Sequence, residues 1–304
     1  MTLKDLGEIG LINRISRKIK LDASVIRGIG DDAAVIAGVS RGKYMLFTCD
    51  MLVEGVHFTR SKAAPFGIGW KAMARNLSDI AAMGGVGRYA VVSLGAPPSA
   101  KVSFIDGIYD GIRAACGKFG VNIVGGDMSR SAKTIVSVSL IGEVEPRCLV
   151  TRSGARAGDF IFVTGSFGGS IKGKHLDFMP RIGEARQIVR NFRVSSMIDV
   201  TDGLILDLSR VLNASRAGAR IHQNLIPLSE DAASFKDALT SGEDFELLFT
   251  LPPGEARRFL KTALAKMDIP VTLIGEVTAR SGGLTLITED AVEIKADPKG
   301  YLHF

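Results

Sequence analysis

Acidic residues recur beside glycine or small polar residues at the ends of apolar runs, and this recurrence constrains the fold more than any other feature of the chain. It occurs in five segments, at residues 28–32, 48–50, 125–127, 199–203 and 242–244. Two bare carboxylates about 4 Å apart repel by about 1 kcal/mol in water and by about 4 kcal/mol at an effective dielectric of about 20. A fold that gathers these acids needs compensating cations, and hard divalent cations with oxygen ligands suit that role. The sequence therefore predicts a site for metal ions and phosphate groups.

Each acid taken alone has an ordinary structural explanation. Asp79, on an expected helix, can pair with Arg75 one turn earlier. Asp199 and Asp202 can cap the helix expected from Leu204. For any single segment this explanation is the better one, but the chain also carries 35 glycines in 304 residues, which suit close approach of backbone to a ligand. Taken together, the segments favour the metal–phosphate site.

Short β-rich runs alternate with helical patterns along the chain. In the first half, strands are expected at 44–50, 88–94, 121–124 and 134–141, and helices at 65–83 and 99–119. In the second half, strands are expected at 160–164, 197–200, 245–251 and 271–274, and helices at 204–214, 230–239 and 255–267. At about 150 residues per domain, the length predicts two domains, 1–147 and 148–304, of mixed α/β class.

Composition and charge exclude several classes of protein. No apolar run reaches the roughly 18 residues of a membrane span, and the N-terminus has no apolar secretory segment, so we expect a cytoplasmic protein without membrane contact. The net charge is +6, but the basic residues form no run of five, which argues against a nucleic-acid partner and fits anionic small molecules. Three cysteines without a C-x-x-C pair argue against a disulfide framework or zinc site.

Two phosphate-binding motifs are approximated but incomplete. Residues 28–33 approximate the dinucleotide fingerprint, yet place two carboxylates where a pyrophosphate would lie. Residues 168–174 approximate a P-loop, but His175 stands where a hydroxyl residue must bind Mg²⁺. Neither a Rossmann nor a Walker site is therefore predicted.

Taken in order, the acidic segments and their surroundings resemble the thiamine-monophosphate kinase family of the aminoimidazole-ribonucleotide-synthetase-like superfamily. The matching strings are GIGDDAAVI (28–36), TCDMLVEGVHF (48–58), NLSDIAAMGG (76–85), IVGGDMSR (123–130), TRSGARAGD (151–159), IDVTDGL (198–204), SGEDFELLFT (241–250) and GYLHF (300–304). They span nearly the whole chain, and their joint occurrence is highly specific, whereas GDD or GGD alone would be weak.

The resemblance implies a fold, a reaction and partners. It implies two α/β domains, with the N-terminal strands of two copies joining into a barrel, so that the protein is a homodimer. It also implies ATP as co-substrate, several Mg²⁺ ions, and in-line phosphorylation of thiamine monophosphate to thiamine diphosphate. The acceptor phosphate oxygen is already anionic near neutral pH, so this chemistry needs charge neutralisation and positioning more than a general base.

The resemblance also implies site residues, position by position. The metal-binding positions are Asp31, Thr48, Cys49, Asp50, Asp79, Asp127, Asp199 and Asp202, of which Asp50, Asp127 and Asp202 are the expected catalytic residues. The ATP-contacting positions are Tyr109, Gly126, Arg152 and Thr201. The acceptor-contacting positions are His57, Glu243 and Pro298.

Three departures from the family pattern keep the acceptor open. Pro298 stands where the family has an aromatic residue that packs on thiamine, the segment after Gly165 is shorter, and Cys49 replaces a common hydroxyl residue. One alternative is therefore an ATP-dependent enzyme of the same fold with a different small-molecule acceptor. Another is a noncatalytic sensor of Mg·ATP, although simple binding would need fewer acids.

Overall fold

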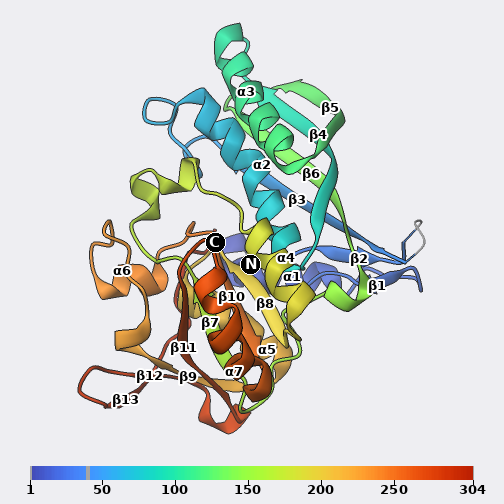
Figure 1. Cartoon of the computed structure of the whole chain (residues 1–304). Helices are drawn as coiled ribbons and strands as arrows, with labels where there is room; N and C mark the ends of the chain where they lie inside the picture. Colours follow the sequence, from blue (N-terminus) through green and yellow to red (C-terminus); the bar gives the residue numbers. More distant parts are fainter. Residues whose placement is uncertain (1, 39–41, 304) are drawn as a thin grey trace.

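The chain forms two β-sheets, one from each half of the sequence (Figure 1). The computed structural model describes residues 2–38 and 42–303. The first sheet has the order β1-β2-β3-β6-β4-β5, from β1 (Val25–Arg27), β2 (Ala34–Ile36), β3 (Tyr44–Val53), β4 (Val86–Ala96), β5 (Asn122–Arg130) and β6 (Ile135–Val144). The second has the order β13-β12-β9-β11-β7-β10-β8, from β7 (Phe160–Thr164), β8 (Ser196–Val200), β9 (Gly218–His222), β10 (Glu246–Leu251), β11 (Val271–Thr278), β12 (Leu284–Ile287) and β13 (Glu293–Lys295).

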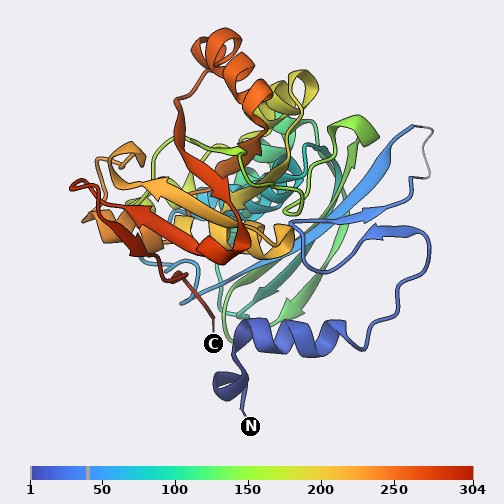
Figure 2. The same ribbon diagram turned by 90° about the horizontal axis from the view of Figure 1, so that it is seen from below.

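Seven α-helices accompany the sheets in the described part of the chain. They are α1 (Leu3–Ser16), α2 (Pro65–Ala82), α3 (Val102–Phe119), α4 (Ile182–Asn191), α5 (Leu204–Ser215), α6 (Phe235–Thr240) and α7 (Pro253–Thr262). None of the helices described here combines the length and apolar character that crossing a bilayer requires. Figure 2 shows α1 lying apart from the sheets, close to the C-terminal end of the chain.

Helices α2 and α3 cover one face of the first sheet (Figure 1). Leu46 and Leu52 of β3 point into this layer and are buried, whereas Phe47 and Met51 point to the opposite face and are exposed. The two helices approach closely at Gly69, where a Cβ atom would come within 1.8 Å of the Ile108 carbonyl oxygen. One face of this sheet therefore belongs to the core and the other is open.

The second sheet is covered on both faces. Phe162 and Phe249 pack with Phe259 of α7 on one face, and Ile198 and Leu248 pack with α5 on the other. The first of these clusters is continuous with the core beneath α2, which also contacts β8. This continuous packing fixes α2 and β8 relative to each other, and both carry predicted site residues.

The expected position of two acids at or beyond a strand end is wrong. Asp50 lies inside β3, which continues to Val53, and Asp127 lies inside β5, which continues through the glycine pair to Arg130. Asp199 is the residue before the last of β8, as in the strand expected at 197–200. Glycine is poor in strands, but β5 is an edge strand that pairs only with β4 among the described residues, and a Cβ on Gly126 would come within 2.0 Å of the Val92 carbonyl oxygen. These acids therefore project from strand faces.

Most expected elements are present, with different bounds. The helix expected at 230–239 is confined to α6, because the hydroxyl of Ser234 accepts a hydrogen bond from the backbone N–H of Asp237 and caps the helix there. Helices α1 and α4 and the strands β1, β2, β9, β12 and β13 were not expected from the sequence pattern.

Candidate active site

Three aspartates from distant parts of the chain meet where the two halves join. Carboxylate oxygens of Asp32, Asp79 and Asp199 lie within 4.8 Å of one another. Asp32 precedes β2, Asp79 lies on the last turns of α2, and Asp199 lies on β8. The Thr48 hydroxyl donates to Asp79 and the Ser78 hydroxyl donates to Asp199, both at 2.5 Å. The structure thus forms the cluster of repelling carboxylates that the sequence predicts.

Burial dominates the electrostatics of this cluster. It raises the pKa of Asp79 well above its usual value, and the neighbouring Asp50 and Asp199 carboxylates raise it further. Burial also raises the pKa of Asp199, with Asp32 as the next cause. A group whose charged form is so disfavoured is suited to a cation that restores the charge.

Asp32 is the member of the cluster that the sequence interpretation did not select. Its side chain is completely buried, and one oxygen accepts hydrogen bonds from the Arg152 guanidinium. Its second oxygen, Oδ2, has no partner among the residues that the structure describes. Asp31, which was selected, instead accepts a 2.7 Å hydrogen bond from the backbone N–H of Arg152. A buried carboxylate oxygen without a donor is a suitable metal ligand.

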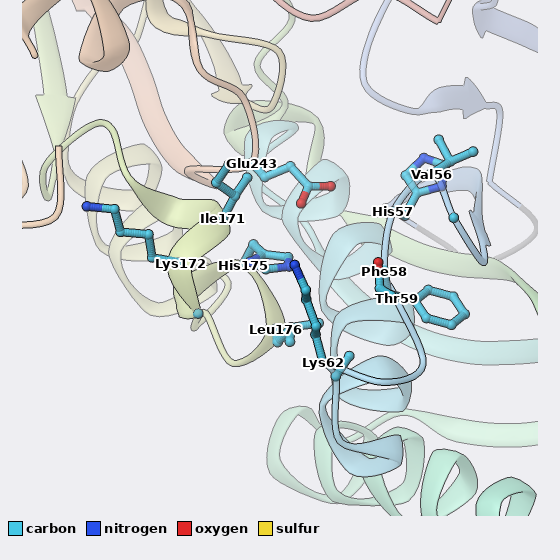
Figure 3. A pocket seen from close by; sticks show the side chains of 13 residues that line it. Val56, His57, Phe58, Thr59, Lys62, Ile171, Lys172, His175, Leu176 and Glu243 are labelled. Atoms are coloured by element: carbon cyan, nitrogen blue, oxygen red, sulfur yellow. The ribbon is translucent and has the colours of Figure 1, made fainter. Parts of the chain in front are cut away.

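Three adjoining cavities lead away from the triad. The metal-side cavity, of about 680 Å³, is lined by residues that include Asp31, Asp32, Thr48, Cys49, Asp50, Arg75, Asp79, Arg152, Thr201, Asp202 and His303. The junction cavity, of about 130 Å³, shares Arg75, Thr201, Asp202 and His303 with it. The outer cavity, of about 370 Å³, shares His57, Glu243 and two apolar residues with the junction cavity (Figure 3). The shared walls place the three cavities in a row.

Buried Lys71 organises the outer part of the row. Its ammonium group lies 2.5 Å from Oε2 of Glu243 and donates a 2.9 Å hydrogen bond to the carbonyl oxygen of His57. The His57 ring accepts a 3.0 Å hydrogen bond at Nδ1 from the backbone N–H of Val53. Burial, together with the charges of Arg75 and Lys71, lowers the pKa of His57 to about 3, so the ring is neutral.

The loop that carries Glu243 has an unusual backbone. Glu243 has φ +68° and Phe245 has φ +52°, in the left-handed region that non-glycine residues rarely adopt. Phe245 stacks on Phe178 with ring centroids 3.8 Å apart, and Asp244 accepts a hydrogen bond from Ser170 at 2.5 Å. Packing on both sides therefore holds a strained segment at the cavity wall, which is a common feature of binding sites.

The C-terminal tail closes one side of the junction cavity. The backbone N–H of Tyr301 donates to the Asp202 carbonyl oxygen at 2.9 Å, and that of His303 donates to the Glu8 carboxylate at 3.0 Å. The His303 ring lies 5.3 Å from the His57 ring. Phe304, the last residue of the matching C-terminal string, lies outside the described residues.

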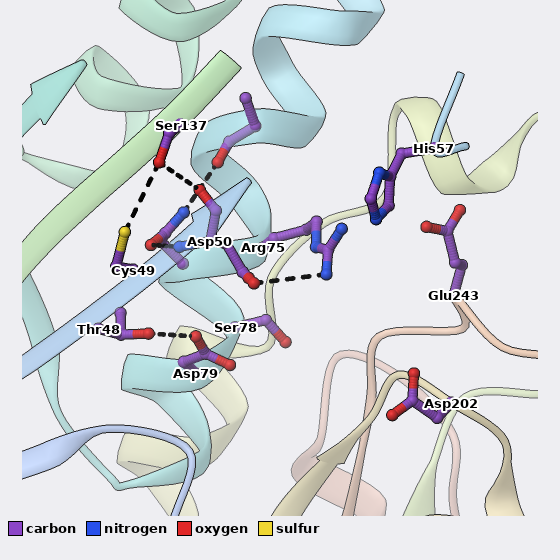
Figure 4. Close-up of polar contacts among 12 residues, drawn as sticks. Thr48, Cys49, Asp50, His57, Arg75, Ser78, Asp79, Ser137, Asp202 and Glu243 are labelled. Atoms are coloured by element: carbon purple, nitrogen blue, oxygen red, sulfur yellow. Dashed lines mark hydrogen bonds and ion pairs between the residues drawn. The ribbon is translucent and has the colours of Figure 1, made fainter. Parts of the chain in front are cut away.

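The structure brings most of the predicted site residues together. Those that line the metal-side cavity or belong to the triad are Asp31, Thr48, Cys49, Asp50, Asp79, Asp199, Asp202, Arg152 and Thr201. His57 and Glu243 line the junction and outer cavities. The Cys49 side chain points to the open face of the first sheet, where its Sγ atom lies 3.6 Å from the Ser137 hydroxyl (Figure 4). The Sγ atom therefore points away from the triad, and the backbone carbonyl oxygen of Cys49 is the atom that could bind a metal.

Four predicted residues lie outside this row of cavities in the described chain: Tyr109, Gly126, Asp127 and Pro298. Asp127 pairs across β4 and β6 in the row Asp127–Ser93–Ser137–Met51. Paired residues point to the same face of a sheet, so Asp127 lies on the open face and Asp50 on the helix-covered face. Three strand spacings of about 4.8 Å also separate β5 from β3.

The ordinary structural explanations of the acids are not what the structure shows. The Arg75 guanidinium lies 3.4 Å from the Asp50 carboxylate, while Asp79 accepts its hydrogen bond from Thr48 (Figure 4). Helix α5 is capped at Gly203 without a side-chain hydrogen bond, so neither Asp199 nor Asp202 serves as its cap.

Sequence reasoning missed Asp32, Lys71 and Arg75. The signal for the two basic residues was their spacing, because Lys71, Arg75 and Asp79 follow one another at intervals of four residues and so share one face of α2. For Asp32, the signal was the doubled acid of the segment 28–32.

Two family models match the chain. The model of AIR synthase related protein, N-terminal domain, matches residues 30–144, and that of AIR synthase related protein, C-terminal domain, matches residues 155–287. The thiamine-monophosphate kinase of Rhodopirellula baltica is 39% identical over 292 residues, which cover 91% of this chain and 90% of that protein. That of Aquifex aeolicus is 35% identical and covers 100% of both chains.

Solved structures give the same result. The structure described as AaThiL complexed with AMPPCP and TMP has a TM-score of 0.86 and 33% identity, and covers 100% of this chain and 99% of its own. Escherichia coli HypE, a hydrogenase maturation protein, shares the fold, with a TM-score of 0.74 at 18% identity over 96% of this chain and 98% of its own. The chain therefore belongs to the thiamine-monophosphate kinase family of phosphotransferases and has the two-domain mixed α/β fold of the AIR synthase related proteins.

Proposed function

We propose that this chain transfers the γ-phosphoryl group of ATP to the phosphate of thiamine monophosphate, which yields thiamine diphosphate and ADP. The observation that carries the proposal is the row of three cavities, which runs from the carboxylate triad to Glu243 and His57. Such a row can hold a nucleotide at one end and an acceptor at the other. The relatives named thiamine-monophosphate kinase, and the related structure with AMPPCP and TMP, support the choice of substrates.

The donor set fits Mg²⁺. The triad offers hard carboxylate oxygens, and the buried Oδ2 atom of Asp32 has no hydrogen-bond partner among the described residues. Asp32, Asp79 and Asp199 would hold one part of the metal cluster, and Asp31, Thr48, Asp50 and Asp202 border the same cavity. Bound Mg²⁺ neutralises phosphate charge and orients the reacting groups.

The protein residues supply binding and positioning. Arg152 is held against Asp32 at the wall of the metal-side cavity, where its remaining donors suit phosphate oxygens. Lys71 fixes the carboxylate of Glu243, whose charge complements the cationic thiazolium and the amino group of thiamine. The neutral His57 ring is not required as a base, because the acceptor oxygen is anionic.

We also propose that the protein is a homodimer in which the N-terminal strands of two copies join into a barrel, with the open faces of the first sheets turned toward each other. The proposed domains are 1–147 and 148–304. The open face of the first sheet carries exposed apolar side chains at Phe47, Met51, Tyr89 and Val91. Patches of this kind mark protein contacts. Asp127 lies on the same face, where a second copy would cover it. A metal site that is shared between two copies would therefore explain why Asp127 and Asp50 of one chain lie far apart.

A turnover assay tests the proposed reaction. ADP release is measured with ATP and Mg²⁺, with and without thiamine monophosphate, and the product is identified by mass spectrometry. We expect stimulation by thiamine monophosphate and formation of thiamine diphosphate. Unphosphorylated thiamine is the matched control and should not stimulate, since it lacks the acceptor oxygen. Slow ADP release that ignores thiamine monophosphate would instead favour a different acceptor or a sensor.

A further inference from the structure

Arg75 occupies the point where the two inner cavities meet. It lies on α2, one turn from Lys71 and one turn from Asp79. Its side chain lines both the metal-side cavity and the junction cavity, and only 16% of it is exposed. Figure 4 shows its guanidinium between the Asp50 carboxylate and the group formed by His57, Glu243 and Asp202. Arg75 therefore borders the region where a phosphoryl group would cross from one cavity to the other.

Most of the hydrogen-bonding capacity of Arg75 is unused. A guanidinium has five N–H donors in a planar fork. In the described chain, the side chain has one polar contact, from Nη2 to Oδ1 of Asp50 at 3.4 Å, which is long for an ionic hydrogen bond. Its Nε and Nη1 atoms are buried and have no partner within the same residues. Because Arg75 lines two of the cavities, these buried donors are available to a ligand there.

The other basic residues at the site are already engaged. Lys71 pairs with Glu243, Arg152 pairs with Asp32, and Arg210 pairs with Asp202 and Asp207. The carboxylates that face Arg75 are Asp50, Glu243, Asp79 and Asp202, and they raise its pKa although burial opposes the charge. Arg75 is thus a permanently charged fork with donors to spare.

We propose that Arg75 is a catalytic residue that binds the transferred phosphoryl group through its Nε–H and Nη1–H donors, an inference that rests on the proposed function. In the transfer, an acceptor phosphate oxygen forms a bond to the γ-phosphorus while the bond from that phosphorus to the β–γ bridging oxygen breaks. The bridging oxygen keeps the electron pair, ADP leaves, and no proton has to move. Arg75 stays charged throughout and offsets the negative charge that two phosphates bring together.

A purely structural arginine in the same protein has different contacts. Arg186 of α4 donates to the Gly84 carbonyl oxygen at 2.6 Å and to Glu145 at 2.9 Å. It lines none of the three cavities in the described chain. Arg186→Gln is therefore the matched control, and we expect it to lower the thermal midpoint without changing kcat of the folded protein.

The test compares Arg75→Gln with the wild type in the full-length protein. We expect kcat with thiamine monophosphate to fall about 100-fold, as for the loss of a transition-state donor, with an unchanged thermal midpoint. Independently of turnover, we expect AMPPCP, which keeps the γ-phosphoryl group, to bind about tenfold more weakly in calorimetry with Mg²⁺ and without thiamine monophosphate. A folded Arg75→Gln protein with the wild-type kcat and affinity would overturn the proposal.

Two further arms keep the outcome decisive. If Arg75→Gln does not fold, Arg75→Lys replaces it. We expect a lower kcat for Arg75→Lys, because an ammonium group cannot reproduce the planar fork of a guanidinium. A wild-type kcat in Arg75→Lys would overturn the proposal. If the wild type itself does not phosphorylate thiamine monophosphate, the proposed function fails, and Mg²⁺-pyrophosphate becomes the calorimetric probe. Equal affinity of wild type and Arg75→Gln for that probe would then overturn the role of Arg75 separately.

Discussion

The ammonium nitrogen of Lys71 lies 2.5 Å from Oε2 of Glu243, and the lysine side chain is completely inaccessible to solvent. A second hydrogen bond from the same nitrogen reaches the His57 carbonyl oxygen. One buried charge thus positions both residues that are proposed to contact the acceptor. Burial lowers the pKa of Lys71 to about 8, although Glu243 acts in the opposite direction.

We predict that acceptor binding weakens above pH 8. Lys71 loses its proton there, Glu243 loses its ionic partner, and KM for thiamine monophosphate should rise while kcat changes little. Lys71→Met should raise KM by about tenfold at neutral pH and remove the rise above pH 8. Steady-state kinetics from pH 6.5 to pH 9.5, roughly spanning this pKa, provide the measurement. A KM of Lys71→Met that equals the wild-type value would contradict the role.

The same lysine should influence stability. Its folded-state pKa, about 8, lies below the ordinary value of 10.5, so the unfolded chain binds more protons between these pH values. Stability contributed through Lys71 therefore rises as pH increases through this window. Denaturant unfolding of wild type and Lys71→Met should show this rise only in the wild type, and parallel pH curves for the two proteins would argue against a buried charged lysine.

We predict that Asp32 matters more for metal binding than Asp31. Loss of a residue that only orients a ligand lowers metal affinity by about 10–100-fold, so loss of a ligand itself should cost about 100-fold. Asp32→Asn should therefore weaken Mg²⁺-dependent nucleotide binding by about 100-fold. Asp31→Asn should weaken it less, because Asp31 accepts a hydrogen bond from the Arg152 backbone. Calorimetric titration of both variants checks this order, and the reverse order would show that Asp31 is the ligand.

Asp199→Asn should separate metal binding from stability. The folded-state pKa of Asp199 is raised. Above the ordinary carboxylate range, the folded chain therefore binds more protons than the unfolded chain. The stability of the metal-free protein consequently falls as pH rises. The amide should remove this cost and raise the metal-free thermal midpoint by a few degrees near neutral pH. Mg²⁺ should stabilise the wild type and have a smaller effect on the variant. Equal Mg²⁺ shifts in both proteins would exclude Asp199 as a ligand.

The open face of the first sheet predicts the oligomeric state. Val91→Asp places a charge on the exposed apolar face, so the sedimentation mass should fall from a dimer to the 32.4 kDa of one chain. Turnover should fall with it, because Asp127 lies on that face. Val102→Asp, at an exposed apolar residue at the start of α3, is the control and should leave the dimer intact. A wild type that sediments as a single chain would refute the dimer.

Local sequence patterns predicted which helices and strands form better than they predicted where each one ends. The helix expected at 65–83 corresponds to α2, where Met73, Leu77 and Ile80 recur at helical spacing on the buried face. The strand β5 was underestimated because glycine and aspartate are poor strand formers, and its pairing with β4 overrides that preference.

The site was predicted in its chemistry but not in its detail. Sequence alone cannot tell which of the adjacent Asp31 and Asp32 points into the cluster, since the local turn decides it. The expected pairing of Arg75 with Asp79 failed because Asp50, distant in sequence, reaches Arg75 from β3. Likewise, the placement of Asp127 on the opposite face depends on a cross-strand register that no local pattern specifies.

The central claim is that Asp32, Asp79 and Asp199 come together to bind divalent cations that hold the phosphates. The most direct measurement is a crystal structure with Mn²⁺, a non-hydrolysable ATP analogue and thiamine monophosphate, with anomalous scattering used to locate the metal. The account predicts anomalous peaks in coordination contact with these three carboxylates and with phosphate oxygens. Nucleotide bound elsewhere, with no metal at the triad, would contradict it.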